Sequence, residues 1–81
     1  PPVTEVAVRM IQTVSGHKLI FDDTSGSEAV KIEDANGNKI TLDANGVTIE
    51  SAKDVTIKGQ NVTIEATAKY TLKGNPIHLN P

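Results

Sequence analysis

From residue 30 to residue 79 the chain repeats one short pattern, in which two apolar residues flank a third residue that is most often Thr. After the first gap the copies lie seven or eight residues apart. Alternation with a period of two is typical of a β-strand with one buried face, and β-branched residues favour such a pleated surface. The copies are Val30-Lys31-Ile32, Ile40-Thr41-Leu42, Val47-Thr48-Ile49, Val55-Thr56-Ile57, Val62-Thr63-Ile64, Tyr70-Thr71-Leu72 and Ile77-His78-Leu79. The pattern predicts a regular series of strands and turns.

The chain before the repeat has a different pattern of apolar and polar residues. Residues 1–14 carry an irregular apolar pattern, and Leu19-Ile20-Phe21 predicts a strand that ends in the polar loop 22–27. We expect residues 1–27 to be incoming strands and a loop that connect to a missing upstream domain. Residues 28–81 are then the repetitive part, ending in a blunt apolar tip. Because the chain begins with Pro1-Pro2 and not Met, we expect it to be a piece of a longer protein.

The length of the repeat limits the architecture. A β-helix made by one chain needs a coil of roughly 18 residues or more, so each unit here is too short. An antiparallel meander remains, as does a helix of strands in which three chains each supply one side of every layer. The meander requires a hairpin turn at every junction, which Asn36-Gly37 and Asn45-Gly46 suit. The junctions at 51–53, 60–61 and 66–69 do not suit it.

A thin apolar face on one chain needs a cover, and identical copies related by closed cyclic symmetry would supply it. We therefore predict an all-β fold, an intertwined trimeric β-helix shaped as a triangular prism. The middle residue of each triplet points outward, and its apolar neighbours point to a shared axis. The predicted trimer core is Val30, Ile32, Ile40, Leu42, Val47, Ile49, Val55, Ile57, Val62, Ile64, Tyr70 and Leu72.

Composition excludes several classes of function. The formal net charge of -2 and the lack of a basic stripe argue against binding to nucleic acid. The absence of Cys excludes a disulfide framework and thiol chemistry. Only 2% of the residues are aromatic, so the bulky side chains of a compact core are missing. A dry aliphatic prism of this kind has no cavity for a small molecule.

Each group of residues that could form a catalytic or metal site has a simpler structural explanation. Ser15, His17 and Asp22 formally make a hydrolytic triad, but such triads assemble from distant segments around a pocket. His78 lies between two residues that face the axis, so it points outward. The loop Asp34–Asn38 resembles a calcium loop but has Gly at the fourth place and not the sixth, which favours a turn closed by the Asp side chain. We predict no enzyme activity, no metal site and no cofactor.

Two strings of residues, Ser15–Asp23 and Lys31–Ile40, together with the Val-Thr-Ile ladder, resemble the C-terminal region of central spike proteins. These are the VgrG proteins of type VI secretion and the baseplate spikes of contractile phage tails and related injection particles. The resemblance covers nearly the whole chain from about Ser15. It implies a homotrimeric needle that caps a contractile tail and is driven through a target cell envelope. It also implies an oligosaccharide-binding-like domain upstream, through which tail or baseplate proteins bind.

The resemblance implies a location and a further partner. The location is a phage virion tail or a bacterial secretion apparatus, from which the needle reaches the extracellular side and the target cell. The partner is a conical PAAR-repeat protein seated on the tip, formed by Pro76, Ile77, His78, Leu79, Asn80 and Pro81. Three copies of an apolar end layer would invite such a partner. In the alternative reading, the two Pro residues only end the strand.

A second class of function stays open. The column of outward Thr residues could make the array a surface-binding module for ice or carbohydrate. The column consists of Thr41, Thr48, Thr56, Thr63 and Thr71. Ice-binding faces use ranks of two Thr per coil, whereas here each Thr has apolar neighbours on both sides. We expect assays of either activity to be negative.

Overall fold

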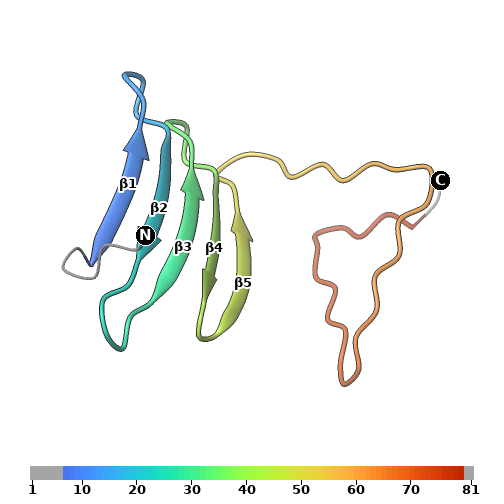
Figure 1. Ribbon diagram of the computed structural model, residues 1–81. Helices are drawn as coiled ribbons and strands as arrows, with labels where there is room; N and C mark the ends of the chain where they lie inside the picture. Colours follow the sequence, from blue (N-terminus) through green and yellow to red (C-terminus); the bar gives the residue numbers. More distant parts are fainter. Residues whose placement is uncertain (1–6, 80–81) are drawn as a thin grey trace.

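The computed structural model describes residues 7–79, and this part of the chain is all-β. Five strands form one antiparallel sheet in sequence order (Figure 1). They are β1 (Val8–Gln12), β2 (Lys18–Asp22), β3 (Ala29–Glu33), β4 (Lys39–Asp43) and β5 (Gly46–Glu50). The described residues form no helix, and so none that could span a membrane. The all-β prediction is confirmed.

The turn residues explain why the strands pair with their sequence neighbours. Asn36-Gly37 joins β3 to β4 and Asn45-Gly46 joins β4 to β5, as expected of hairpin connections. Gly37 has a φ of +94° and Gly46 a φ of +122°, a region that side chains with a Cβ rarely adopt. The meander that the sequence left open is therefore the architecture of residues 8–50.

The register lines up residues in rows across the sheet. One row is Ile11, Leu19, Ile32, Ile40 and Ile49, and the next is Arg9, Phe21, Val30, Leu42 and Val47. Successive residues of a strand point to opposite faces, so these two rows share one face, which we call the apolar face. Arg9 is the one charged residue in these two rows.

The opposite face, which we call the polar face, carries the middle residues of the triplets. Thr41 and Thr48 are direct cross-strand partners there. A row beside them alternates in charge through Lys18, Glu33, Lys39 and Glu50. Opposite charges on facing strands stabilise the pairing of the sheet, and they keep this face in water. Val8, Met10 and Ile20 also lie on this face, so the β1–β2 hairpin is apolar on both sides.

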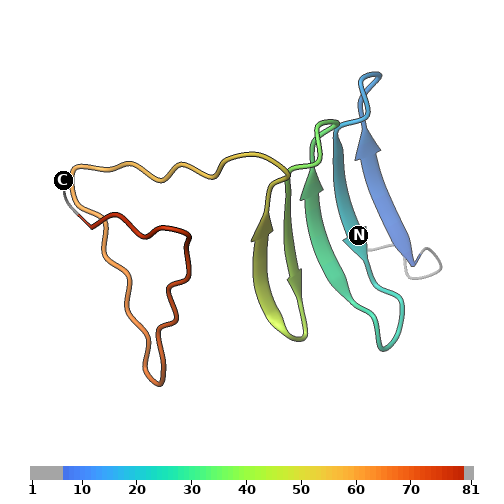
Figure 2. The same ribbon diagram turned by 180° about the vertical axis from the view of Figure 1, so that it is seen from behind.

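After Glu50 the chain leaves the sheet. Residues 51–79, which we call the arm, contain no strand. The arm first runs away from β5 in the direction in which the strands stack, and its later part forms a loop that doubles back (Figures 1 and 2). Four of the seven triplets lie in the arm, beginning with Val55-Thr56-Ile57. They form no strand within the single chain, so their strand structure stays a prediction for an assembly of several copies.

The predicted division of the chain at residues 27 and 28 stays a prediction. In the structure the sheet runs across this point, because β2 pairs with β3 along its whole length. The change in local structure comes instead after Glu50. The first six residues of the predicted incoming segment lie outside the described part of the chain.

Candidate assembly surface

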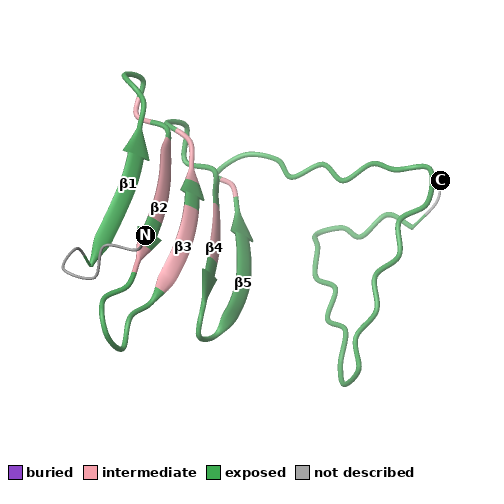
Figure 3. Cartoon of the chain, in the orientation of Figure 1, coloured by how far each residue is buried: buried purple, intermediate pink, exposed green. Residues whose placement is uncertain are grey.

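The described part of the chain, residues 7–79, has no hydrophobic core of its own. None of the residues from 7 to 79 is buried, and Figure 3 shows only intermediate and exposed positions. A stable domain of this size normally encloses its large apolar side chains, because their burial is the main force that opposes the entropy of the unfolded chain. The exposed apolar surface therefore indicates that the chain is completed by another molecule.

The largest part of this surface is the apolar face. Its side chains range in exposure from intermediate, as for Val30, to 66% for Val47. A sheet with one apolar face needs a second layer, and no described element of the chain packs on it. Six predicted core residues lie together here: Val30, Ile32, Ile40, Leu42, Val47 and Ile49. Their role in a trimer core stays a prediction.

The other predicted core residues lie in the arm. Val55, Ile57, Val62, Ile64, Tyr70 and Leu72 are between 51% and 68% exposed. The single chain does not bring them onto the apolar face of the sheet. At the predicted tip, Ile77 is 45% exposed and Leu79 is 75% exposed, with Pro76 and His78 beside them also exposed. The last two tip residues, Asn80 and Pro81, lie outside the described residues.

Sequence reasoning missed three members of the apolar face. Ile11, Leu19 and Phe21 were assigned to the incoming segment, yet the register aligns them with the rows of the later strands. A signal for two of them was present, because Leu19-Ile20-Phe21 has the spacing of the later triplets with Ile at its centre. The irregular apolar pattern around Ile11 gave no comparable signal.

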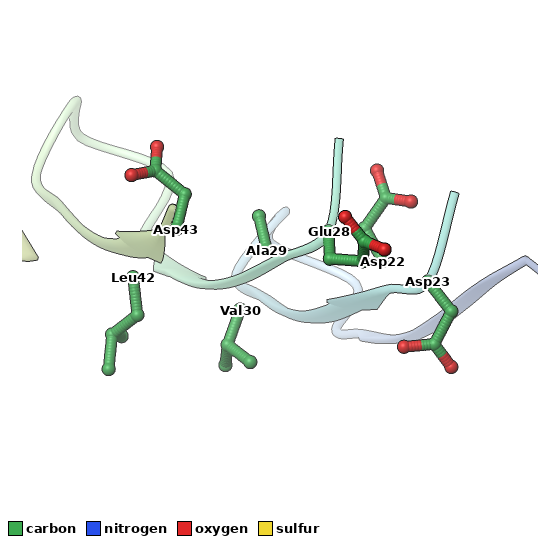
Figure 4. Close-up of a pocket in the computed structure, with 7 residues that line it drawn as sticks. All are labelled: Asp22, Asp23, Glu28, Ala29, Val30, Leu42 and Asp43. Carbon is green, nitrogen blue, oxygen red and sulfur yellow. The ribbon is translucent and has the colours of Figure 1, made fainter. Parts of the chain in front are cut away.

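A shallow hollow lies at one end of the sheet, where β2 ends, β3 begins and β4 ends (Figure 4). Val30 and Leu42 point to the same side of the sheet as Asp23, while Ala29 and Asp43 point to the other side. Asp22 and Glu28 complete the lining, and the volume is about 300 Å³. Within residues 7–79 no group of three or more His, Cys, Asp or Glu side chains is placed to hold a metal ion.

Hydrogen bonds join three segments at the other end of the sheet. Asp34 accepts hydrogen bonds from the backbone N–H groups of Asn36 at 2.9 Å and Asn38 at 3.0 Å, and from both of their side-chain amides. The Ser51 hydroxyl, at the start of the arm, donates to the side-chain oxygen of Asn38. The Ala35 N–H donates to Nδ1 of His17 at 3.1 Å. The Asp-closed turn predicted for this loop is confirmed, and it also positions the arm.

These contacts separate the residues of the formal triad. His17 lies before β2, where its Nδ1 accepts the Ala35 N–H. Asp22 lies at the opposite end of that strand and accepts the Thr24 N–H at 2.9 Å. Hydrogen bonds from Thr24 also hold the pKa of Asp22 below its usual value. The strand therefore keeps the imidazole and the carboxylate apart, and no hydrolytic relay is assembled.

The Asp34 turn leads to a prediction of pH dependence. Hydrogen bonds from the side chain and backbone of Asn38, and from the backbone of Asn36, hold the pKa of Asp34 far below its ordinary value. Because the folded state favours the carboxylate, its contribution to stability is complete above the unfolded pKa of about 4 and is lost as the pH falls through the folded pKa. Asp34→Ala should lower the thermal midpoint at pH 7 and reduce the drop in midpoint on acidification from pH 5 to pH 2.5.

Circular dichroism melts at the two pH values measure this effect. The matched control is Asp54→Ala, which removes a carboxylate from the arm and leaves the turn intact. If Asp34→Ala and wild type lose the same number of degrees on acidification, the hydrogen bonds of the turn are not what makes the chain sensitive to acid.

Comparison with known families gives one match. The model for the phage baseplate V C-terminal trimerisation domain matches residues 8–79, which include all five strands and the arm. A search of curated proteins found no match to this chain. The family is described as a trimerisation domain, which supports a homotrimer associated with a phage baseplate, a structural role and a place in the virion tail. The spike-like resemblance noted in the sequence is confirmed: the chain belongs to the phage baseplate V C-terminal trimerisation domain family.

Proposed function

We propose that three copies of this chain form a rigid needle at the end of a contractile tail, or of a related type VI secretion machine, which pierces a target cell envelope. The observation that carries the proposal is an apolar face on which no described element packs, in a chain of a trimerisation family. Three such faces turned toward one axis would cover one another. The same arrangement leaves the charged row on the polar face in water.

The direction in which the arm leaves the sheet supports a long rod. The first part of the arm runs from β5 along the stacking direction of the strands, and the longest dimension of the chain is 53 Å (Figure 1). With the axis along this direction, the ladder of backbone hydrogen bonds also runs along the rod. Axial force from a contracting tail would then press strand against strand through many hydrogen bonds acting in parallel. The needle would work by stiffness and by locking between chains.

The tip suits a docked partner. Ile77 and Leu79 remain exposed near the end of the arm, and three copies would gather them into one apolar end plate. We propose a conical PAAR-repeat protein as the occupant, as the resemblance to spike proteins implies. The aliphatic repeat, and the separation of His17 from Asp22 by the length of β2, fit a mechanical role better than a chemical one.

Analytical ultracentrifugation tests the trimer directly. We expect a species of three times the chain mass of 8.6 kDa, and a species of one chain mass would contradict the proposal. Adding a PAAR-repeat protein should shift the sedimenting boundary. The double variant Ile77→Asp/Leu79→Asp should lose that shift, while the mid-arm control Thr63→Asp should keep it. If the trimer forms but its sedimenting boundary does not shift, the proposed needle is retained and the docking role is excluded.

A second candidate is a surface-binding array. The cross-strand pair Thr41 and Thr48 on the polar face favours it. The charged row next to that pair and the Lys31 in its own row interrupt the uniform surface that ice binding needs. A thermal hysteresis measurement and a glycan array decide the question, and we expect both to be negative.

A further inference from the structure

The two hairpin turns contain the two Asn-Gly pairs of the chain, Asn36-Gly37 and Asn45-Gly46. Each turn uses Gly because its backbone has a positive φ there. Gly has no side chain to hinder approach to its own backbone nitrogen, which makes Asn-Gly the dipeptide most prone to deamidation. All four residues are exposed to water. The hairpins therefore depend on two pairs that are chemically labile in an unstructured chain.

Deamidation is a reaction of the Asn side chain with the backbone nitrogen of the next residue. That nitrogen loses its proton and attacks Cγ of the Asn. The new N–Cγ bond forms, the Cγ–Nδ2 bond breaks, and Nδ2 takes up a proton and leaves as ammonia. Water then opens the cyclic imide at either carbonyl carbon and leaves aspartate or isoaspartate. The reaction needs no reagent besides water, but Cγ must come to lie against the next nitrogen.

At Asn45 the strand ladder limits this reaction. Gly46 is the first residue of β5 and pairs with Asp43 of β4. The attacking nitrogen therefore belongs to a residue whose backbone is fixed in the sheet. Asp43 accepts a hydrogen bond from the Asn45 N–H at 2.9 Å. Within residues 7–79 no hydrogen bond holds the side-chain amide of Asn45, so the protection comes from the backbone.

At Asn36 the protection comes from a side chain. Gly37 lies in the turn between β3 and β4 and not in a strand. Nδ2 of Asn36 donates a hydrogen bond to Oδ2 of Asp34 at 3.3 Å, and the Asn36 N–H donates to Oδ1 at 2.9 Å. The first bond holds the amide toward residue 34 and away from Gly37. The negative charge of the acceptor also opposes the anion that forms on the attacking nitrogen.

We propose that Asp34 protects Asn36 from deamidation, and that Asn36 is the residue modified when this protection is lost. The inference goes beyond the needle and does not depend on the trimer. Conversion of Asn36 would place a second carboxylate beside Asp34, and like charges repel. The same turn contains Asn38, which accepts the hydrogen bond from Ser51 at the start of the arm. Modification would thus loosen the contact that positions the arm.

Peptide mass spectrometry after incubation of the full chain at mildly alkaline pH tests the proposal. Cleavage after lysine places Asn36 and Asn45 on separate peptides, and fragment spectra locate the converted residue. The variant Asp34→Asn keeps Oδ1, which accepts the backbone N–H groups of Asn36 and Asn38, and replaces Oδ2, which accepts their side-chain amides. We expect Asn36 to convert roughly tenfold faster in this variant than in wild type, the factor that a hydrogen bond to a charged acceptor provides. The rate at Asn45 should not change.

A second variant separates the Asp34–Asn36 contact from the general rigidity of the turn. Asn38→Ala removes the bonds of the Asn38 side chain to Asp34 and Ser51 but leaves Asp34 bonded to Asn36. Its rate at Asn36 should stay close to that of wild type, and an increase there would overturn the proposal, also if Asp34→Asn unfolds and Asn45 accelerates with it. An unchanged rate at Asn36 in folded Asp34→Asn would overturn it too. So would a wild-type rate at Asn36 equal to that of the chain in guanidinium.

Discussion

Replacing Ile40 by Asp is expected to convert the trimer into single chains. Ile40 lies on β4 in the middle of the apolar face, with Ile32 and Ile49 as its cross-strand partners. In a trimer closed around this face the change would bury three carboxylates, and the effective penalty is still several kcal/mol for each unpaired ion. In a single chain the same position borders water, so the cost of the change arises in the assembly.

The neighbouring residue supplies the control. Thr41→Asp introduces the same charge one position along, on the polar face. It should keep the trimer and change the free energy of unfolding by no more than about 0.5 kcal/mol per chain, as is usual for surface substitutions. Ultracentrifugation at matched concentrations compares the oligomeric mass of the two variants, and circular dichroism compares their strand content. A stable Ile40→Asp trimer would show that the copies meet through another surface.

The sequence predicted the local structure of residues 18–50 well because the signals there are local. Asn-Gly turns set the two hairpins, and alternation set which residues share a face. The segment Leu19-Ile20-Phe21 was also predicted to be a strand, and it lies within β2. Its place on the common apolar face was not recognised, since that depends on the pairing of β2 with β3 across the polar loop 22–27.

The point at which the sheet ends was harder to predict. Val47-Thr48-Ile49 and Val55-Thr56-Ile57 are the same triplet, so side-chain pattern cannot tell a strand paired within the chain from one that lacks such a partner. Turn chemistry gave a partial answer, because the junction 51–53 lacks a hairpin signal. The contact that directs the arm, from Ser51 to Asn38, joins residues 13 positions apart and has no sequence signature.

The arm should contribute most of the resistance to unfolding. In the single chain Val55, Ile57, Val62 and Ile64 are 51% to 68% exposed, so replacing them by Ser would cost that chain little. In an assembly that encloses them, each loses the roughly 1.5 to 3 kcal/mol gained by burying a side chain of this kind. The size of the effect therefore reports whether the arm is enclosed. We expect the fourfold Ser variant to unfold at a much lower guanidinium concentration and far faster than wild type.

The outward positions of the same triplets supply the control. Thr56→Ser/Thr63→Ser alters the arm at the same places but removes only methyl groups that face water in the proposed prism. Its midpoint and unfolding rate should lie close to those of wild type. If the fourfold Ser variant matched this control, the arm would be exposed in the assembly as it is in the single chain. Stiffness would then have to come from the sheet alone, and residues 51–79 could not form the shaft of a needle.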